Sequence, residues 1–342
     1  MKYDVIIIGG GQAGLSMGYY LQKSNLTFLI LDELSEIGEV WKNRYDSLRL
    51  FTPSYFSSLP GFRLDSDLYP TKDDIANYLK LYVKRFSLPL RMNTKVNRLF
   101  FVNDEFVMET NHCLIKANNV VVATGPFQKP NIPDFSTLLS NEVFQIHSSD
   151  YQNPSQLKQG PALVVGGGNS GAQIAAELSD GRKVFLSVGH KMSFLPQDVG
   201  DKSIFWYLNK LGVYKAPHYS WFGKILKKKP DPIFGYELKR LIKNKTIMLK
   251  PRTISSEDSF VLFQDKTRIK VDNVIWATGY KPDYSWIELD EIFSEKGYPI
   301  HNRGVTSQKG LYFLGLPWQH NRSSALIQGV GEDAGYIFNQ LK

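Results

Sequence analysis

A glycine pattern, GxGxxG, occurs twice in the sequence and constrains the fold more than any other feature. The first copy starts at Gly9 and the second at Gly166, 157 positions later. Each copy follows a short apolar run typical of a strand, 5–8 and 162–165, and precedes a helical pattern. These glycines permit a tight turn, a close approach of backbone to a pyrophosphate, and close packing of helix on strand. The sequence therefore predicts an α/β chain with two Rossmann-like dinucleotide-binding domains.

Helix N-termini are expected at both phosphate sites, where free N–H groups and a partial positive charge favour an anion. A glycine-rich turn without a nucleotide could explain one copy of the pattern, but two copies in the same context favour binding. The residues expected to cradle the nucleotides are Gly9, Gly11, Gln12, Ala13 and Gly14 in the first copy, and Gly166, Gly168, Asn169, Ser170 and Gly171 in the second.

The strand that follows the first pattern, 27–31, ends in two acidic residues, Asp32 and Glu33. Asp32 lies 23 residues after Gly9, about where a carboxylate accepts a hydrogen bond from a ribose hydroxyl. The first site is therefore expected to take an adenosine with an unphosphorylated ribose, as in FAD or NAD.

The matching strand of the second unit, 183–188, has no acid after it. It ends in Gly189, His190 and Lys191, and this segment holds no arginine that could grip a phosphate at two points. A lysine beside a histidine still favours a 2′-phosphate over a bare ribose. NADPH is therefore expected at the second site, with NADH tolerated.

Two further strands, 120–122 and 274–276, each end in an Ala-Thr-Gly turn. We interpret both turns as points where the chain crosses between domains. This interpretation predicts a FAD domain of residues 1–152 and 282–342, interrupted by an inserted NAD(P)H domain of residues 153–281. The turn residues expected beside the cofactors are Ala123, Thr124, Gly125, Ala277, Thr278 and Gly279.

Composition excludes several classes of protein. The only cysteine, Cys113, leaves no internal disulfide, no CxxC redox pair and no multi-cysteine zinc site. We expect no metal, and a reducing cytoplasm fits best. No run reaches the ~18 apolar residues of a membrane span, so none is expected.

The net charge of +8 is unevenly spread, because residues 224–252 hold ten basic residues and two acidic ones. This stretch could be a solvated helical face, a field that attracts a phosphorylated cofactor, or a docking face for an anionic partner. No nucleic-acid motif accompanies it, and no nucleic acid is expected as a partner.

Local patterns predict further elements. Thr71 and Asp74 form a capping-box pattern ahead of an amphipathic helix over 71–86. The other predicted elements are a small antiparallel sheet from 96–101 and 106–108, a helical region over 201–219, a strand over 310–315 and a last helix led by Ser323 or Ser324.

Together these motifs resemble the two-dinucleotide-binding flavoproteins and, within them, the bacterial flavin-containing monooxygenases. The shorter branch described as flavoproteins associated with cation efflux or potassium transport is especially similar. The resemblance runs from Asp4 to about Ile337. It rests on both GxGxxG patterns, both Ala-Thr-Gly turns, and the segments 38–41, 44–50, 59–61 and 315–318.

The resemblance implies FAD at the first pattern and NADPH at the second. It also implies that Val40 and Trp41 line the flavin, that backbone near Val96 meets the adenine, and that Gln328 touches the flavin edge. A homodimer is one assembly that such folds adopt. The residues expected at the reacting centre are Trp41, Phe51, Trp318, Gln319 and Arg322.

The sequence departs from this family in several places. The monooxygenase fingerprint FxGxxxHxxx(F/Y) keeps His147 and Tyr151 but has Asn141 and Val143 in place of Phe and Gly. His147 is then expected to hold the linker between domains. Phe51 stands where many relatives carry an Asn that steadies the oxygen adduct of the flavin. Where related disulfide reductases carry Gly-Asp after their late strand, this chain has Gly-Leu at 315–316.

By resemblance, NADPH reduces the flavin, which then forms a C4a-hydroperoxide that oxygenates a soft nucleophile, a sulfide or amine, with some hydrogen peroxide released. The protein's task is to bind, orient and exclude water. Two alternatives stay open. One is a flavin reductase or oxidase that passes electrons to a quinone, a small disulfide or a protein, which Phe51 and the altered fingerprint favour. The other is a nucleotide-sensing accessory subunit of an ion transporter, docked through 224–252.

Overall fold

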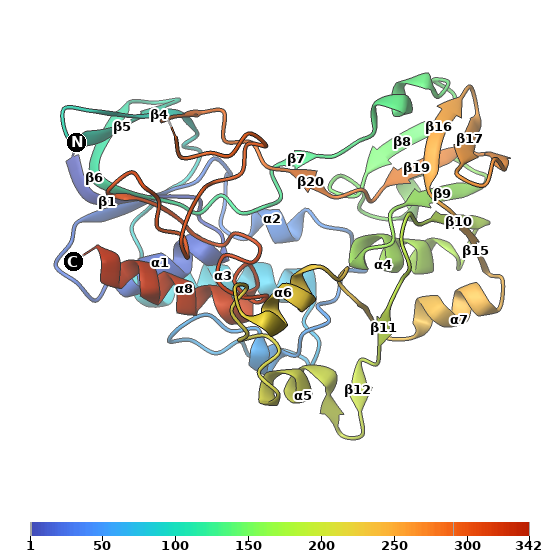
Figure 1. Cartoon of the computed structure of the whole chain (residues 1–342), viewed down its shortest axis with the longest axis horizontal. Helices are drawn as coiled ribbons and strands as arrows, with labels where there is room; N and C mark the ends of the chain where they lie inside the picture. The colour runs from blue at the N-terminus through green and yellow to red at the C-terminus, as the bar shows by residue number, and fades with distance from the viewer. Residues whose placement is uncertain (1, 290, 342) are drawn as a thin grey trace.

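The computed structural model describes residues 2–289 and 291–341, which form two lobes, each built on a sheet (Figure 1). The first sheet has the strand order β21-β4-β5-β6-β1-β2-β3, with β22 paired to β6. Its central strand β1 pairs in parallel with β2 and β6. The strands are β1 (Lys2–Ile8), β2 (Phe28–Leu31), β3 (Leu90–Arg91), β4 (Val96–Val102), β5 (Glu105–Thr110), β6 (Leu114–Val122), β21 (Ile287–Glu288) and β22 (Leu311–Phe313).

Side chains of β1 alternate between two cores, as the pleat of a strand requires. Val5 and Ile7 pack in the core formed with the helices, and Ile6 and Ile8 pack in the core formed with β4, β5 and β6. The helices lie below the sheet in Figure 1, with α8 against α1. The helical elements of this lobe are α1 (Gln12–Leu21), α2 (Glu39–Lys42), α3 (Lys72–Phe86), α8 (Ile327–Gln340) and the short 3₁₀ helix η1 (Ser54–Phe56).

The second sheet has five parallel strands in the order β15-β10-β9-β19-β8. This sheet includes β8, although β8 lies within residues 1–152, which the sequence assigns to the FAD domain. The two sheets confirm the predicted α/β fold with two Rossmann-like units. The elements of this lobe are β8 (Phe144–His147), β9 (Ala162–Val165), α4 (Asn169–Leu178), β10 (Val184–Ser187), α7 (Glu237–Lys243), β15 (Ile247–Lys250), β19 (Asn273–Trp276), the antiparallel strands β16 (Thr253–Glu257), β17 (Phe260–Phe263) and β18 (Arg268–Lys270), and the 3₁₀ helices η2 (Asp134–Leu138) and η3 (Pro154–Gln156).

Two antiparallel strands connect the lobes, β7 (Lys129–Pro130) and β20 (Tyr280–Lys281), and they run side by side in Figure 1. Each strand follows one of the Ala-Thr-Gly turns, where the sequence predicts that the chain crosses between domains. Asn131 fastens the crossing, since its N–H donates to the carbonyl of Gly279 at 2.9 Å and its carbonyl accepts from the Thr278 hydroxyl at 2.5 Å.

A long segment, 194–236, leaves the second lobe and lies against the first (Figure 1). The predicted helix over 201–219 is correct only in part, because α5 ends at Lys210 and Gly212 takes a left-handed φ of 70°. Its elements are β11 (Phe194–Leu195), β12 (Asp198–Val199), β13 (Lys202–Ser203), α5 (Ile204–Lys210), α6 (Trp221–Lys227) and β14 (Ile233–Phe234).

The other local elements lie where the sequence predicts them, except that the last helix begins later than expected. Thr71 caps α3 in a reciprocal capping box with Asp74, as predicted. The last helix begins at Ile327 rather than at the two serines, because the Ser324 hydroxyl accepts from backbone N–H groups at 320 and 321 and thereby shapes the loop. Within 2–289 and 291–341, no helix combines the length and the hydropathy needed to span a bilayer.

Candidate nucleotide-binding and flavin site

The first glycine turn is closed by backbone contacts that only glycine permits. A β-carbon on Gly9 would lie 2.5 Å from the carbonyl oxygen of Ala123, and one on Gly14 would lie 1.8 Å from the carbonyl oxygen of Gly9. Gly9 also has a left-handed φ of 110°. These contacts bring the end of β1, the start of α1 and the first Ala-Thr-Gly turn together.

The second glycine turn repeats this geometry. A β-carbon on Gly166 would lie 2.1 Å from the carbonyl oxygen of Ala277, and one on Gly171 would lie 2.0 Å from the carbonyl oxygen of Gly166. Gly166 has a φ of 122°. The end of β9, the start of α4 and the second Ala-Thr-Gly turn therefore meet as their counterparts do in the first lobe.

The middle glycine of each pattern faces open space. Among the residues that the structure describes, no atom lies within 4 Å of a β-carbon placed on Gly11 or Gly168, and the same holds for Gly125 and Gly279 in the facing turns. Neither α1 nor α4 has a side-chain cap at its N-terminus. Each lobe thus has an uncapped helix start beside a space lined by backbone, which fits the pyrophosphate of a dinucleotide.

Asp32 stands at the end of β2, beside the first cradle. Its carboxylate accepts from the N–H groups of Gly10 at 2.5 Å and Leu34 at 2.9 Å. Burial raises the pKa of Asp32, and the two N–H bonds oppose this effect. Each carboxylate oxygen has a second acceptor position, so this arrangement still fits a ribose hydroxyl. Glu33 beside it is exposed and pairs with Lys95 at 3.6 Å.

The loop after β22 meets the start of α1. A β-carbon on Gly315 would lie 2.9 Å from the Ala13 side chain, and the Gln12 amide donates to the carbonyl of Ala325 at 3.4 Å. Trp318 takes a left-handed φ of 57°, a conformation that is uncommon for a bulky residue. Gln328 lies in the first turn of α8, whose N-terminus also lacks a side-chain cap.

Gln319 is buried, and both its amide oxygen and its amide nitrogen bond to backbone. Its amide oxygen accepts from the N–H of Leu316 at 3.1 Å, and its amide nitrogen donates to the carbonyl of Arg303 at 3.3 Å. These bonds shape the loop that carries Trp318. Gln319 is therefore suited to position this loop, and we treat it as a positioning residue.

The remaining predicted flavin-side residues lie on three elements of the first lobe. Trp41 is half-buried on α2 and packs against the helix-side core, while Val40 is exposed. Val96 is buried at the start of β4. Arg322 forms an ion pair with Asp231 and thereby ties the loop after β22 to the segment 194–236.

Phe51 lies where the two lobes meet. Its ring stacks on Phe205 of α5 and on Phe234 of β14, with centroids 5.8 Å and 4.8 Å away. Phe205 also stacks on Tyr214 at 5.5 Å, and Gln197 donates to the Phe51 carbonyl at 2.7 Å. We call Phe51, Phe205, Tyr214 and Phe234 the aromatic cluster. It presents apolar ring surface that would exclude water from a neighbouring reaction.

Sequence reasoning missed two residues that hold Arg44–Leu50, the loop that precedes Phe51. Lys72 is buried, and its ammonium group donates to the carbonyls of Lys42 at 3.0 Å and Arg44 at 2.8 Å and to Asp46 at 2.8 Å. The buried Tyr45 donates to Gln173 of α4 at 2.6 Å. The sequence contains one signal that Lys72 has a special role. It stands in the first turn of α3, where a basic residue is unfavourable because of the helix dipole.

An arginine lies beside the expected 2′-phosphate site, although the segment after β10 has none. Arg252 follows β15, and its guanidinium donates to the carbonyl of Gly189 at 3.5 Å. The parallel pairing of β10 with β15 brings both strand ends to one edge of the sheet. An arginine distant in sequence therefore lies at the edge where the segment after β10 has none. An adjoining pocket of about 510 Å³ has four basic residues in its lining, His190, Lys191, Lys239 and Lys250, together with six apolar residues.

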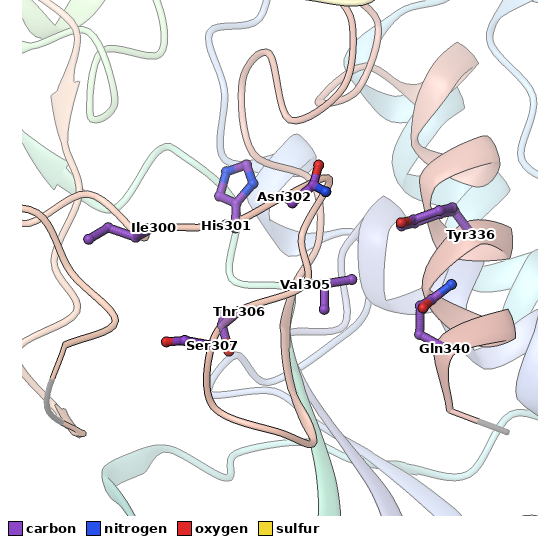
Figure 2. Close-up of a pocket in the computed structure, with 8 residues that line it drawn as sticks. All are labelled: Ile300, His301, Asn302, Val305, Thr306, Ser307, Tyr336 and Gln340. Carbon is purple, nitrogen blue, oxygen red and sulfur yellow. The ribbon is translucent and has the colours of Figure 1, made fainter.

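A second pocket, of about 550 Å³, lies between α8 and residues 300–307 (Figure 2). Its polar lining includes His301, Asn302, Tyr336 and Gln340. None of its lining residues belongs to either glycine turn or to the predicted flavin-side set, so it has no part in the site described here.

His147 fastens the crossing between the lobes, as expected. Its Nδ1 accepts from the Ser149 N–H at 3.1 Å, which leaves Nε2–H to donate to the carbonyl of Gly279 at 3.0 Å. Burial lowers the pKa of His147 below its usual value of about 6.5. The folded protein therefore favours the neutral ring.

This arrangement predicts a loss of stability in acid. Below pH ~6.5 the unfolded chain binds a proton that folded His147 resists, so the free energy of unfolding should fall as pH falls. In His147→Gln the decline should be shallower, by at most about 1.4 kcal/mol per pH unit. Urea unfolding of both proteins at pH values above and below 6.5 checks this. Partial burial also lowers the pKa values of His301 and His320. Both histidines are present in both proteins, so their contributions to the two slopes cancel. Equal slopes would contradict the role of His147.

Two sheets with matching glycine cradles and an apolar cluster between the lobes fit a protein that binds two dinucleotides, and comparisons with known proteins identify its class as the flavin-dependent oxidoreductases. Residues 6–199 match the family model described as pyridine nucleotide-disulphide oxidoreductase, and the chain belongs to this family.

Comparison with individual relatives shows which members of this family the chain resembles. It is 55% identical over 340 residues to a CzcO-like oxidoreductase of Geobacillus kaustophilus, covering 99% of this chain and 98% of that one. It is 26% identical to the probable indole-3-pyruvate monooxygenase YUCCA3 of Arabidopsis thaliana, covering 91% and 81%. A flavin-containing monooxygenase from Stenotrophomonas maltophilia has a TM-score of 0.83 at 26% identity, covering 99% and 98%. The expected resemblance to flavin monooxygenases is confirmed, in the CzcO branch.

Proposed function

We propose that this flavoprotein is an NADPH-dependent monooxygenase that inserts one oxygen atom into a soft nucleophile, an organic sulfide or amine. FAD would occupy the cradle at Gly11 and NADPH the cradle at Gly168. When bound, the flavin accepts two electrons from the nicotinamide and activates oxygen. One oxygen atom then enters the product and the other leaves as water, with NADPH supplying the two electrons.

The aromatic cluster carries this proposal. Phe51 comes from the FAD lobe, and Phe205 and Phe234 come from the segment that leaves the NADPH lobe. Their stacked rings form an apolar surface that would exclude water from the reaction. We assign Trp41 and Trp318 to the same apolar lining. The exposed Cys113 is the only cysteine, so a dithiol relay within the chain has no residues to use.

The second lobe includes β8 and η2, so the first domain boundary is proposed at the crossing strand β7 rather than at 152/153, and the second stays at 281/282, directly after β20. The reaction is proposed to take place in the cytoplasm, with a homodimer as one assembly. Small molecules, the substrate and oxygen, are the partners it requires. The chain itself supplies aromatic ring surface and backbone N–H donors on both sides of the boundary between the lobes.

An isotope experiment tests the reaction. Holoenzyme, NADPH and ¹⁸O₂ are mixed with methyl phenyl sulfide, and the sulfoxide is analysed by mass spectrometry. We expect ¹⁸O in the sulfoxide and one NADPH consumed for each sulfoxide formed. NADPH consumption that yields only hydrogen peroxide, with unlabelled or no sulfoxide, would refute the monooxygenase.

A reductase or oxidase is the second candidate, and one observation favours it. Phe51 stands where many relatives carry an Asn, and its ring is held between Phe205 and Phe234. A phenyl ring offers no hydrogen bond to an oxygenated flavin. Electrons would then pass to a quinone, a small disulfide or a protein, and the isotope experiment would give peroxide alone.

The basic edge beside the second cradle predicts selectivity for NADPH. Arg252→Ala and Lys191→Ala should each raise the KM for NADPH roughly 10- to 100-fold, because a hydrogen bond to a charged group contributes roughly 1.5–3 kcal/mol. The KM for NADH should change little. Steady-state NADPH and NADH oxidation measures both, with Arg268→Ala on β18 as the control. Equal changes for both cofactors would dismiss these two residues as phosphate ligands.

A further inference from the structure

The segment 202–230 combines exposed aromatic residues with a high density of lysines. It contains seven lysines and no acidic residue, together with seven aromatic residues. Several large apolar side chains in it are open to solvent. Trp221 is 78% exposed, Leu211 is 75% exposed and Tyr219 is 63% exposed. Large exposed apolar groups gathered in one segment mark an interaction surface.

The helix α6 presents these groups on its outer side. Gly223 is buried, and a β-carbon there would lie 2.0 Å from the carbonyl oxygen of Pro217 in the turn that leads into the helix, so this side of α6 faces inward. Trp221 and Ile225 are one helical turn apart and share the outer face. Phe222 beside them is also exposed. We call Trp221, Phe222 and Ile225 the α6 apolar face.

Lysines surround this face without partners of their own. Lys224, Lys227, Lys228 and Lys229 are exposed. In the part of the chain that the structure describes, none of these four forms an ion pair. Their charge therefore remains available to an anionic partner.

We propose that the α6 apolar face and its lysines bind the surface of an anionic lipid bilayer. Tryptophan and tyrosine favour the interface between headgroups and acyl chains, and long lysine side chains let their charges reach the headgroups. An apolar helical face with flanking lysines is the signature of a helix that lies in this interface. Acidic lipids add attraction for every lysine near the surface.

Charge opposes the alternative in which a second copy of this chain covers the face. In a two-fold dimer the same patch meets itself, which would place these lysines against one another.

The α6 apolar face also lies next to the proposed reaction site. The N–H of His218 donates to the carbonyl of His320 at 2.7 Å, and Asp231 pairs with Arg322, so the segment is fastened to the loop that carries Trp318.

Vesicle sedimentation of the FAD-loaded protein tests the proposal. Vesicles of phosphatidylcholine alone are compared with vesicles in which about one third is phosphatidylglycerol. We expect binding to the second kind only. Trp221→Ser/Ile225→Ser should weaken it about tenfold or more. Lys227→Gln/Lys228→Gln/Lys229→Gln should weaken it about a hundredfold, at roughly fivefold per lysine.

A matched triple variant separates this face from general basicity. Lys270→Gln/Lys296→Gln/Lys309→Gln removes the same charge from exposed lysines on other segments, and it should bind much as the unaltered protein does. On adding anionic vesicles, tryptophan emission should shift to the blue in the unaltered protein and not in Trp221→Phe. Failure to bind anionic vesicles at low salt, or equal losses in both triple variants, would overturn the proposal. A dimer in sedimentation velocity that Trp221→Ser/Ile225→Ser disperses would assign the face to a second copy and overturn it equally.

Discussion

Gly11→Val is expected to give a folded protein that no longer retains FAD. The β-carbon position of Gly11 faces open space, since no atom of the described residues lies within 4 Å of it. The valine side chain would occupy the place assigned to the flavin pyrophosphate. Affinity for FAD should fall at least about 100-fold, roughly 3 kcal/mol, and the purified protein should be colourless. Absorbance near 450 nm per chain measures the loss, and circular dichroism checks the fold.

A second open glycine provides the control. Gly181 follows α4, lies in a turn, and would also direct a β-carbon into empty space. Gly181→Val should stay yellow with unchanged stability. If Gly11→Val also stays yellow, the first glycine turn is not where FAD binds.

Gly168→Val is expected to separate the two nucleotide sites. This glycine has the same open surroundings as Gly11, but it begins α4 in the second lobe. The variant should bind FAD in full and remain yellow. Its reduction by NADPH should slow by about 100-fold or more at subsaturating cofactor, because the pyrophosphate can no longer approach the helix start.

Reduction by dithionite distinguishes this outcome from damage to the flavin. Gly168→Val should be reduced by dithionite as fast as the unaltered protein, and only the NADPH-dependent rate should fall. Loss of flavin from Gly168→Val, or an unchanged rate with NADPH, would contradict the assignment of the second cradle.

The parts of the fold that could be predicted from sequence are those fixed by local rules. The glycine turns follow from spacing, because a side chain at Gly14 or Gly171 would overlap the backbone that closes the turn. The start of α3 follows from the capping box of Thr71 and Asp74. Both crossings follow from the strands that end in Ala-Thr-Gly. In each case, residues close in sequence determine the geometry.

The parts that could not be predicted depend on pairing between distant segments. Arg252 reaches Gly189 only because β15 lies parallel to β10, and no spacing rule connects the two residues. Phe51 is half-buried because α5 and β14 return from the second lobe to stack on it. A lysine is ordinarily found at the surface. Lys72 is nevertheless buried, and its ammonium group bonds to three acceptors in a neighbouring segment.

The segment 194–236 makes several of these distant pairings. It contributes Phe205 and Phe234 to the aromatic cluster, Asp231 to the loop after β22, and the exposed α6 apolar face. One segment thus supplies both a wall of the proposed reaction site and the surface that we assign to lipid. Its aromatic and basic composition was visible in the sequence, but its position against the first lobe was not.

Rapid mixing tests the proposed oxygen chemistry most directly. The purified yellow protein is reduced anaerobically with NADPH and then mixed with oxygenated buffer while absorbance spectra are recorded. The monooxygenase predicts a transient species with a spectrum unlike either oxidised or reduced flavin, which decays before oxidised flavin returns. Direct return of the oxidised spectrum, with one hydrogen peroxide per flavin and no transient, would contradict it and leave the reductase or oxidase as the function.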